Sequence, residues 1–282
     1  MTANELGPAP ISAAEAMAVN LRYWEEVVPV HAASRFYDVA GFLAGRSSLG
    51  PIEDSELGSV AGLNVLHLQC HFGMDSLELA RRGAVVTGLD YAATAVAHAR
   101  ALSRNSGLAA RFIECNVCDP AADAGSAYDL VFTSWGVLGW LPDLAAWARL
   151  IAHSLRPGGR FYIVEQHPAV HWFDDDADPA ADLAVRYDHR GDGRPELYDE
   201  PGTYADRSAP VRNTQEYFWR HTMADVLGAL LGAGLSLTWF REHDLIVWPA
   251  LPQLVTDDCR VWRMPAGRPR IPLSFSLSAH KP

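Results

Sequence analysis

The chain has 282 residues, of which 49% are hydrophobic and 20% are charged, and its formal net charge is −11. This length and composition are typical of a globular protein with a large buried core. The negative charge repels polyanions and argues against nucleic acid as a partner. No run approaches the ~20 apolar residues of a membrane span, and the first residues lack the cationic start of a secretory signal. We therefore expect a cytoplasmic protein without a membrane partner, either a monomer or a homodimer.

The four cysteines are few, and most lie in apolar runs, which favours reduced thiols in a cytoplasmic compartment. They are Cys70, Cys115, Cys118 and Cys259. Cys115 and Cys118 form a C-x-x-C motif, but no second pair accompanies them to complete a zinc site, so we expect no metal there. The acidic run at 174–182 is interpreted as a solvated loop.

The pattern of the N-terminal segment predicts helices. Between residues 12 and 45, apolar and aromatic side chains recur at helical spacing on one face, namely Leu21, Trp24, Val28, His31 and Tyr37. Gly, Pro and Ser residues then separate this segment from the first strongly apolar strand. We expect residues 1–60 to form a helical lid segment.

From residue 63 onwards, apolar strands alternate with helices. The pattern predicts strands at 63–68, 84–89, 110–115, 128–133 and 159–165, and helices at 75–82, 92–104 and 142–155. Strands that are apolar on both faces indicate a parallel sheet covered by helices. This part, residues 61–168, is predicted to be the ligand-binding α/β core.

The remainder divides into an insertion and the end of the core. Residues 169–217 break the rhythm with Pro, Asp and Gly and are interpreted as an irregular, substrate-side lid. Residues 218–282 return to the core with a helix near 222–231, a strand at 235–242 and a last strand containing Leu273, Phe275 and Leu277. No helix fits between Trp262 and Ile271, so the last strand should run antiparallel to its neighbour.

The stretch "VLHLQCHFGMDSLELARRGAVVTGLDY" carries the main functional signal. Its second strand ends on Asp90, whose carboxylate is suited to two vicinal ribose hydroxyls, although it could instead cap the helix that begins near Ala92. The preceding loop keeps a glycine only at Gly73, 17 positions before Asp90. A pyrophosphate needs close backbone approach and hence several glycines. The loop therefore favours an adenosine ligand without phosphates, such as S-adenosylmethionine.

The motifs "VLHLQCHFG", "GLDY", "ECNVCD", "YDLVFTSWGVLGWLPDL" and "LRPGGRFYIVEQHP", in this order, resemble a class I S-adenosylmethionine-dependent methyltransferase of the bacterial branch whose first loop reads HFG. The resemblance implies a Rossmann-like, doubly wound, seven-stranded and mostly parallel sheet with an antiparallel C-terminal strand. It implies S-adenosylmethionine as the cofactor, with Asp90 on the ribose, Tyr91 on an adenine face, and Asn116 and Val117 at the adenine edge.

The first strand departs from the broad superfamily, which has an acidic residue there followed by three alternating glycines. The matching positions hold His67, Gln69, His71 and Gly73. Without that carboxylate, the ammonium of the cofactor is expected at backbone carbonyls of residues 68–70 and near Ser134. The full predicted cofactor set is Gln69, Cys70, His71, Gly73, Asp90, Tyr91, Asn116, Val117, Ser134 and Trp135.

The acceptor side is predicted from polar and aromatic residues beyond the fourth and fifth strands. Glu165 and His167, after the fifth strand, and His221 are the acid–base candidates. Aromatic and imidazole groups are expected to line the acceptor site and lid, namely Trp24, His31, Tyr37, Trp140 and Trp219. A metal site of His167, His171 and residues 174–176 is a less favoured alternative.

The sequence predicts a methyltransferase acting on O, N or S of a small, partly apolar acceptor. Two alternatives stay open at this point. A nicotinamide-dependent oxidoreductase shares the acidic end of the second strand. A non-catalytic S-adenosylmethionine-binding protein would need the same cofactor residues but no acid–base group.

Overall fold

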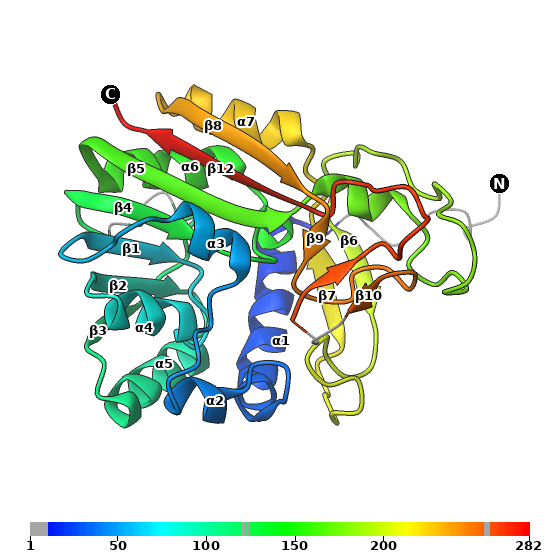
Figure 1. The fold of residues 1–282 in the computed structure, drawn as a ribbon, viewed down its shortest axis with the longest axis horizontal. Helices are drawn as coiled ribbons and strands as arrows, with labels where there is room; N and C mark the ends of the chain where they lie inside the picture. The colour runs from blue at the N-terminus through cyan, green and yellow to red at the C-terminus, as the bar shows by residue number, and fades with distance from the viewer. Residues whose placement is uncertain (1–10, 120–121, 123, 257–259) are drawn as a thin grey trace.

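Seven strands form the central sheet, seen in the computed structural model of the protein in Figure 1. The structure describes residues 11–119, 122, 124–256 and 260–282. The strands are β1 (Asn64–Leu68), β2 (Val85–Asp90), β3 (Ala110–Glu114), β4 (Tyr128–Thr133), β5 (Leu155–Gln166), β8 (Ser236–His243) and β12 (Ser274–His280), in the order β3-β2-β1-β4-β5-β12-β8. β12 pairs antiparallel with both β5 and β8, whereas the pairs among β1 to β5 are parallel. The predicted fold class, including the antiparallel last strand, is confirmed.

Helices cover both faces of this sheet, which explains why its strands are apolar on both sides. The helices that follow the strands are α4 (Met74–Arg81), α5 (Ala93–Ser106), α6 (Leu144–Ser154) and α7 (Met223–Gly232). Trp147 of α6 and Val226 of α7 belong to one core cluster with Leu66 of β1. Leu79 of α4 packs in a second cluster with Val65 of the same strand. Successive residues of β1 therefore face opposite cores.

The N-terminal segment forms α1 (Ala13–Ala33), α2 (Val39–Leu43) and α3 (Pro51–Glu56). α1 begins with a capping box of Ser12 and Glu15. Figure 1 shows α1 across the carboxyl ends of the strands, between the sheet and the β6–β7 hairpin. The helix is fixed to the core by Glu25, whose carboxylate accepts N–H bonds from Ala93 at 2.6 Å and Thr94 at 3.0 Å. Both N–H groups lie in the first turn of α5, where the N-cap residue, Ala92, makes no side-chain hydrogen bond to them.

The segment predicted to be irregular contains a β-hairpin, which the sequence analysis missed. Its strands are β6 (Glu196–Asp199) and β7 (Gln215–Phe218), and they pair antiparallel. Asn20 of α1 holds the hairpin, since its amide exchanges two 2.7 Å bonds with the backbone of Tyr217. Two short 3-10 helices are η1 (Leu138–Trp140) and η2 (Pro168–Trp172), and a small sheet joins β9 (Leu245–Ile246), β10 (Val255–Thr256) and β11 (Trp262–Arg263).

Two further expectations concern membranes and thiols. Within the described ranges, no helix has both the length and the apolar character needed to cross a bilayer. Cys70, Cys115 and Cys118 are free thiols, and Cys259 lies outside the described residues. Burial raises the pKa of Cys70 well above its usual range and the pKa of Cys118 to about 11, so neither thiol ionises readily at neutral pH.

Candidate active site

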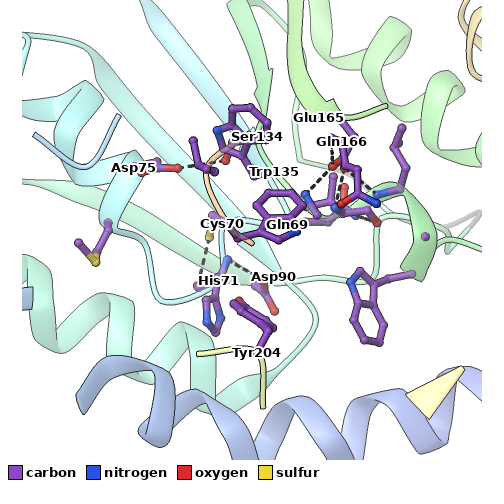
Figure 2. A pocket seen from close by; sticks show the side chains of 18 of the residues that line it. Gln69, Cys70, His71, Asp75, Asp90, Ser134, Trp135, Glu165, Gln166 and Tyr204 are labelled. Atoms are coloured by element: carbon purple, nitrogen blue, oxygen red, sulfur yellow. Dashed lines mark hydrogen bonds between the residues drawn. The ribbon is translucent and has the colours of Figure 1, made fainter. Parts of the chain in front are cut away.

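A cavity of about 660 Å³ opens at the carboxyl ends of the parallel strands, where ligands of open α/β sheets bind. Residues that follow β1, β2, β3, β4 and β5 line it, together with side chains of α1, β7 and the connection before α3. Figure 2 shows part of this wall, with Asp90 and His71 on one side and Glu165 and Gln166 on the other. The cavity joins the predicted cofactor residues to the predicted acceptor residues.

The loop after β1 adopts left-handed backbone conformations without the glycines that normally supply them. Gln69 and His71 both have φ of +52°, and Gly73 has φ of +83°. A non-glycine residue in this region costs ~1–2 kcal/mol, so the surrounding contacts must hold the loop. Cys70 donates its N–H to the Leu89 carbonyl at 2.8 Å, and Gly73 donates to the Cys70 carbonyl at 2.9 Å. The side chains of Gln69 and His71 thus occupy positions where a glycine-rich loop leaves room for phosphates.

Gly73 is required for a second reason. A Cβ atom at this position would lie 2.7 Å from the Phe112 ring and 2.9 Å from the Ala99 side chain. The start of α4 therefore packs directly against β3 and α5. The one glycine that the loop retains lies where both its φ and its neighbours exclude a side chain.

Asp90 lies at the end of β2 and links two backbone segments. Its Oδ2 accepts the His71 N–H at 2.8 Å, and its Oδ1 accepts the Ala92 N–H at 3.0 Å. Burial raises the pKa of Asp90 to about 6, and these N–H bonds oppose the rise. Asp90 therefore caps the turn before α5, as the alternative interpretation expected, and also lines the cavity. The two roles are compatible because each carboxylate oxygen can accept more than one bond.

The side of the cavity predicted to hold adenine contains the predicted residues and one that the sequence did not indicate. Tyr91, Asn116 and Val117 all line the wall. Asn116 Oδ1 accepts the Cys118 N–H at 2.9 Å, which leaves the Asn116 amide hydrogens for another acceptor. Met17 of α1 lines the cavity beside them and also a side hollow of about 310 Å³. α1 therefore contributes to the predicted adenine site.

The loop after β4 is held by Glu165, which we predicted as a catalytic group. Glu165 Oε1 accepts N–H bonds from Gly136 and Gln166, both at 2.6 Å, and Oε2 accepts from Val137 at 2.7 Å and Leu138 at 3.1 Å. Burial raises the pKa of Glu165, and these four donors oppose the rise. With both oxygens used in this way, the geometry gives Glu165 a positioning role for the loop that carries Ser134 and Trp135.

His167 is not among the residues that line the cavity, which corrects its predicted role as an acid–base candidate. Its Nδ1 accepts the Ala169 N–H at 3.1 Å, and its Nε2 lies 3.1 Å from Glu242 Oε1 on β8. The chain turns into η2 directly after β5, so His171 lies on the cavity wall instead, with its Nε2 2.9 Å from the Gln166 amide nitrogen. The alternative metal cluster is not assembled, since no group of three possible ligands occurs among the described residues.

His221 lines the cavity, and its tautomer is set by the backbone. Its Nε2 lies 2.8 Å from the Leu141 carbonyl oxygen, which can only accept, so Nε2 carries the proton and Nδ1 has a free lone pair. Burial lowers the pKa of His221, which keeps the ring neutral at pH 7. A neutral imidazole oriented by a carbonyl is the form that a proton acceptor needs.

Aromatic side chains form much of the cavity wall that is predicted to hold the acceptor. Trp24 and Trp140 meet edge to face with their centroids 5.0 Å apart, and Trp219 and Phe218 line the same cavity. Trp135 also lines it, but its Nε1 donates to Glu53 at 2.7 Å, which fixes the ring. These rings favour a planar or apolar ligand in this part of the cavity.

His31 lies behind the cavity wall rather than on it and connects α1 to the first loop. Its Nδ1 is 3.0 Å from His71 Nε2, and its Nε2 is 3.1 Å from Thr203 Oγ1 in the insertion. Tyr37 lines the cavity, and its hydroxyl bonds to that of Tyr204, the next residue after Thr203. The N-terminal helix, the first loop and the insertion thus meet in one buried polar chain.

Glu216 of β7 is a cavity residue that the sequence analysis missed. Burial raises its pKa to about 7, and the Tyr23 hydroxyl bonds to its carboxylate. The sequence offered only a weak signal, an acidic residue within the aromatic run "EYFW". Glu216 is therefore a second group on the acceptor side that could exchange a proton near neutral pH.

Comparisons with known proteins address the central part of the chain. Residues 65–159 match the family described as a methyltransferase domain. Ubiquinone biosynthesis O-methyltransferases of Aeromonas salmonicida and Cronobacter sakazakii are 31% identical over 135 residues and 32% identical over 143 residues. The alignments cover 46% and 49% of this chain and 56% and 58% of the relatives, so the chain spans just over half the length of these relatives.

Solved structures extend the similarity to most of the chain. An S-adenosylmethionine-dependent methyltransferase from Mesorhizobium loti has a TM-score of 0.58 at 20% identity, covering 85% of this chain and 100% of that one. A DhpI–SAH complex has a TM-score of 0.55 at 16% identity, covering 96% of this chain and 100% of that one. Similarity at this level establishes the fold, and the chain shares its seven-stranded, mostly parallel sheet with these solved structures.

Proposed function

We propose that this chain, which has a methyltransferase domain on the class I fold, transfers the methyl group of S-adenosylmethionine to a hydroxyl oxygen of a small, partly apolar acceptor. The observation that carries the proposal is the single cavity that joins Asp90 and the glycine-poor first loop to an aromatic wall with His221. The O-methyltransferase names of the curated relatives support oxygen as the accepting atom.

The residues present fit S-adenosylmethionine. Asp90 keeps acceptor capacity for ribose hydroxyls, and the Asn116 amide hydrogens are available to an adenine nitrogen. Gln69 Oε1 is buried on the cavity wall without a hydrogen-bond partner, so this part of the wall needs a donor. A dinucleotide fits less well, since Gln69 and His71 place side chains where its pyrophosphate requires open backbone. This difference argues against the oxidoreductase alternative.

The acceptor side supports transfer to a hydroxyl. When bound, S-adenosylmethionine supplies a methyl group on a positively charged sulfur, which is already activated for transfer. His221 Nδ1 would receive the hydroxyl proton while the acceptor oxygen bonds to the methyl carbon and the carbon–sulfur bond breaks. Trp24 and Trp140 would exclude water and hold the acceptor in line, which can contribute up to ~7–11 kcal/mol through proximity and orientation.

Two measurements test the proposal. Thermal shift with S-adenosylmethionine, S-adenosylhomocysteine and NAD should raise the melting temperature with the first two ligands only. Incubation with the labelled methyl donor should then label phenolic acceptors in preference to matched amines and thiols. Stabilisation by NAD alone would contradict the assignment. Binding of S-adenosylmethionine without any product across a broad acceptor panel would favour the non-catalytic binding protein.

A further inference from the structure

Asp75 is a partly buried carboxylate on the cavity wall that received no role in the sequence-based predictions. It lies in the first turn of α4, and its Oδ2 accepts a 3.1 Å bond from the Ser134 hydroxyl after β4. Figure 2 shows Asp75 beside Ser134, with Cys70 and Gln69 of the first loop nearby. The carboxylate thus lies between the first loop and the β4 loop, at the side of the cavity opposite Glu165.

The neighbouring strand position, where the broad superfamily has its acidic residue, cannot supply a charge here. His67 is buried, with Nδ1 2.8 Å from Ser76 Oγ and Nε2 3.4 Å from Ser134 Oγ. Burial lowers the pKa of His67 to about 3, so the ring is neutral at pH 7. His67 therefore neither replaces the missing carboxylate nor neutralises Asp75.

Within the described part of the chain, Asp75 has no ion pair with a basic side chain. Arg82, on the same helix, is engaged with Glu78 and Asp54, at 3.1 Å and 2.6 Å respectively. A partly buried carboxylate without a cation is costly unless a ligand supplies one. The first turn of α4 provides some compensation from its helix dipole, and the hydroxyls of Ser134 and Ser48 donate to the carboxylate, but neither donor carries a positive charge.

Gln69 presents a second acceptor to the same cavity. Its Nε2 donates to the Val137 carbonyl at 3.2 Å, which fixes the amide orientation. Its Oε1 is buried and has no partner. A carboxylate and a neutral amide oxygen together match a group with one positive charge and several N–H donors, which describes a primary ammonium.

We propose that the Asp75 carboxylate and Gln69 Oε1 bind the α-ammonium of the methionine tail, and that Asp75 replaces the acidic residue missing from the end of β1. This inference rests on the proposed function, because it assigns a subsite to the same cofactor. It also predicts that the site discriminates against ligands that carry the adenosine but not the ammonium.

The test compares S-adenosylhomocysteine with its analogue that lacks only the α-amino group, using calorimetry on the full chain. Wild type should bind S-adenosylhomocysteine about 10- to 100-fold more tightly, the range expected for bonds between charged partners. Asp75→Asn should remove most of this preference, because it should weaken the binding of S-adenosylhomocysteine and leave the binding of the analogue nearly unchanged. Asp38→Asn is the matched control, since Asp38 also lines the cavity but pairs with Arg46 at 2.6 Å.

Each outcome separates this inference from the proposed function. Wild type that binds both ligands equally would overturn the subsite without any variant, so the test does not depend on Asp75→Asn folding. If Asp75→Asn lost affinity for both ligands equally, Asp75 would instead support the structure of the loop. If the variant lost turnover but bound both ligands as wild type does, Asp75 would instead act in proton transfer. Either result refutes the proposal. Wild type that binds neither ligand would remove the proposed function itself.

Discussion

Replacing Glu165 with glutamine should destabilise the folded chain, because the carboxylate is the shared acceptor of four backbone N–H groups. Glutamine keeps one acceptor oxygen, so two of these donors would face an NH₂ group instead. A buried donor left without an acceptor costs ~1–3 kcal/mol. The free energy of unfolding should therefore fall by about 2–6 kcal/mol, and the melting temperature by roughly 3–10 °C, because the unfolding entropy of a chain of this size is about 0.6 kcal/mol/K.

Thermal melting of wild type and Glu165→Gln at pH 7.5 measures this change directly. Glu242→Gln is the control, because Glu242 lies on the nearby β8 but its side chain is 54% exposed. The control should change the free energy of unfolding by ~0.5 kcal/mol or less. If Glu165→Gln melts like wild type and loses turnover, the positioning role is wrong and Glu165 acts in proton transfer after all.

Two further predictions concern the cofactor and the base. Asp90→Ala should weaken S-adenosylhomocysteine binding by about 1–3 kcal/mol in calorimetry, since it removes a charged acceptor from the predicted ribose site, and unchanged affinity would exclude Asp90 from that site. Turnover should fall at acidic pH as His221 becomes protonated, with a midpoint below 6.5 because burial lowers its pKa. His221→Gln should abolish this acid limb along with most turnover; a limb that disappears in Glu216→Gln instead would assign the base to Glu216.

The sheet could be predicted well from the sequence, because the patterns that indicate strands and helices are local. Apolar runs such as "AVVTGL" and the alternation of strands with helices determine a parallel sheet whatever the contacts of single side chains. The position of Asp90 at a strand end follows from the same pattern. The β6–β7 hairpin was missed since its strands are only four residues long and are separated by a long connection.

The errors within the site arise from side-chain direction, which local patterns do not determine. Glu165 and His167 are two residues apart, yet Glu165 turns to the β4 loop and His167 to β8, because the chain leaves the strand between them. Asp75 was overlooked because an acidic residue in the first turn of a helix ordinarily faces solvent. The left-handed conformations of Gln69 and His71 were also unpredictable, since positive φ is uncommon in any residue other than glycine.

The hydrogen-bonded chain of His31, His71 and Thr203 should make the packing of α1 against the first loop and the insertion sensitive to acid. Burial lowers the pKa of His31 from 6.5 to about 4 in the folded protein. The unfolded chain therefore takes up a proton at His31 before the folded chain does, so the contribution of this residue to stability is present above pH 6.5 and is lost as the pH falls towards 4. The loss amounts to about 3 kcal/mol at most, by linkage.

Melting temperatures measured from pH 7.5 to 4.5 should consequently fall more steeply in wild type than in His31→Gln. Other buried histidines contribute to the slope of both proteins, so only the difference between the two reports on His31. His189→Gln, at an exposed position of the insertion, should retain the wild-type slope. Parallel slopes for wild type and His31→Gln would mean that the His31 ring is hydrated in solution, and that its bonds to His71 and Thr203 do not hold α1, the first loop and the insertion together.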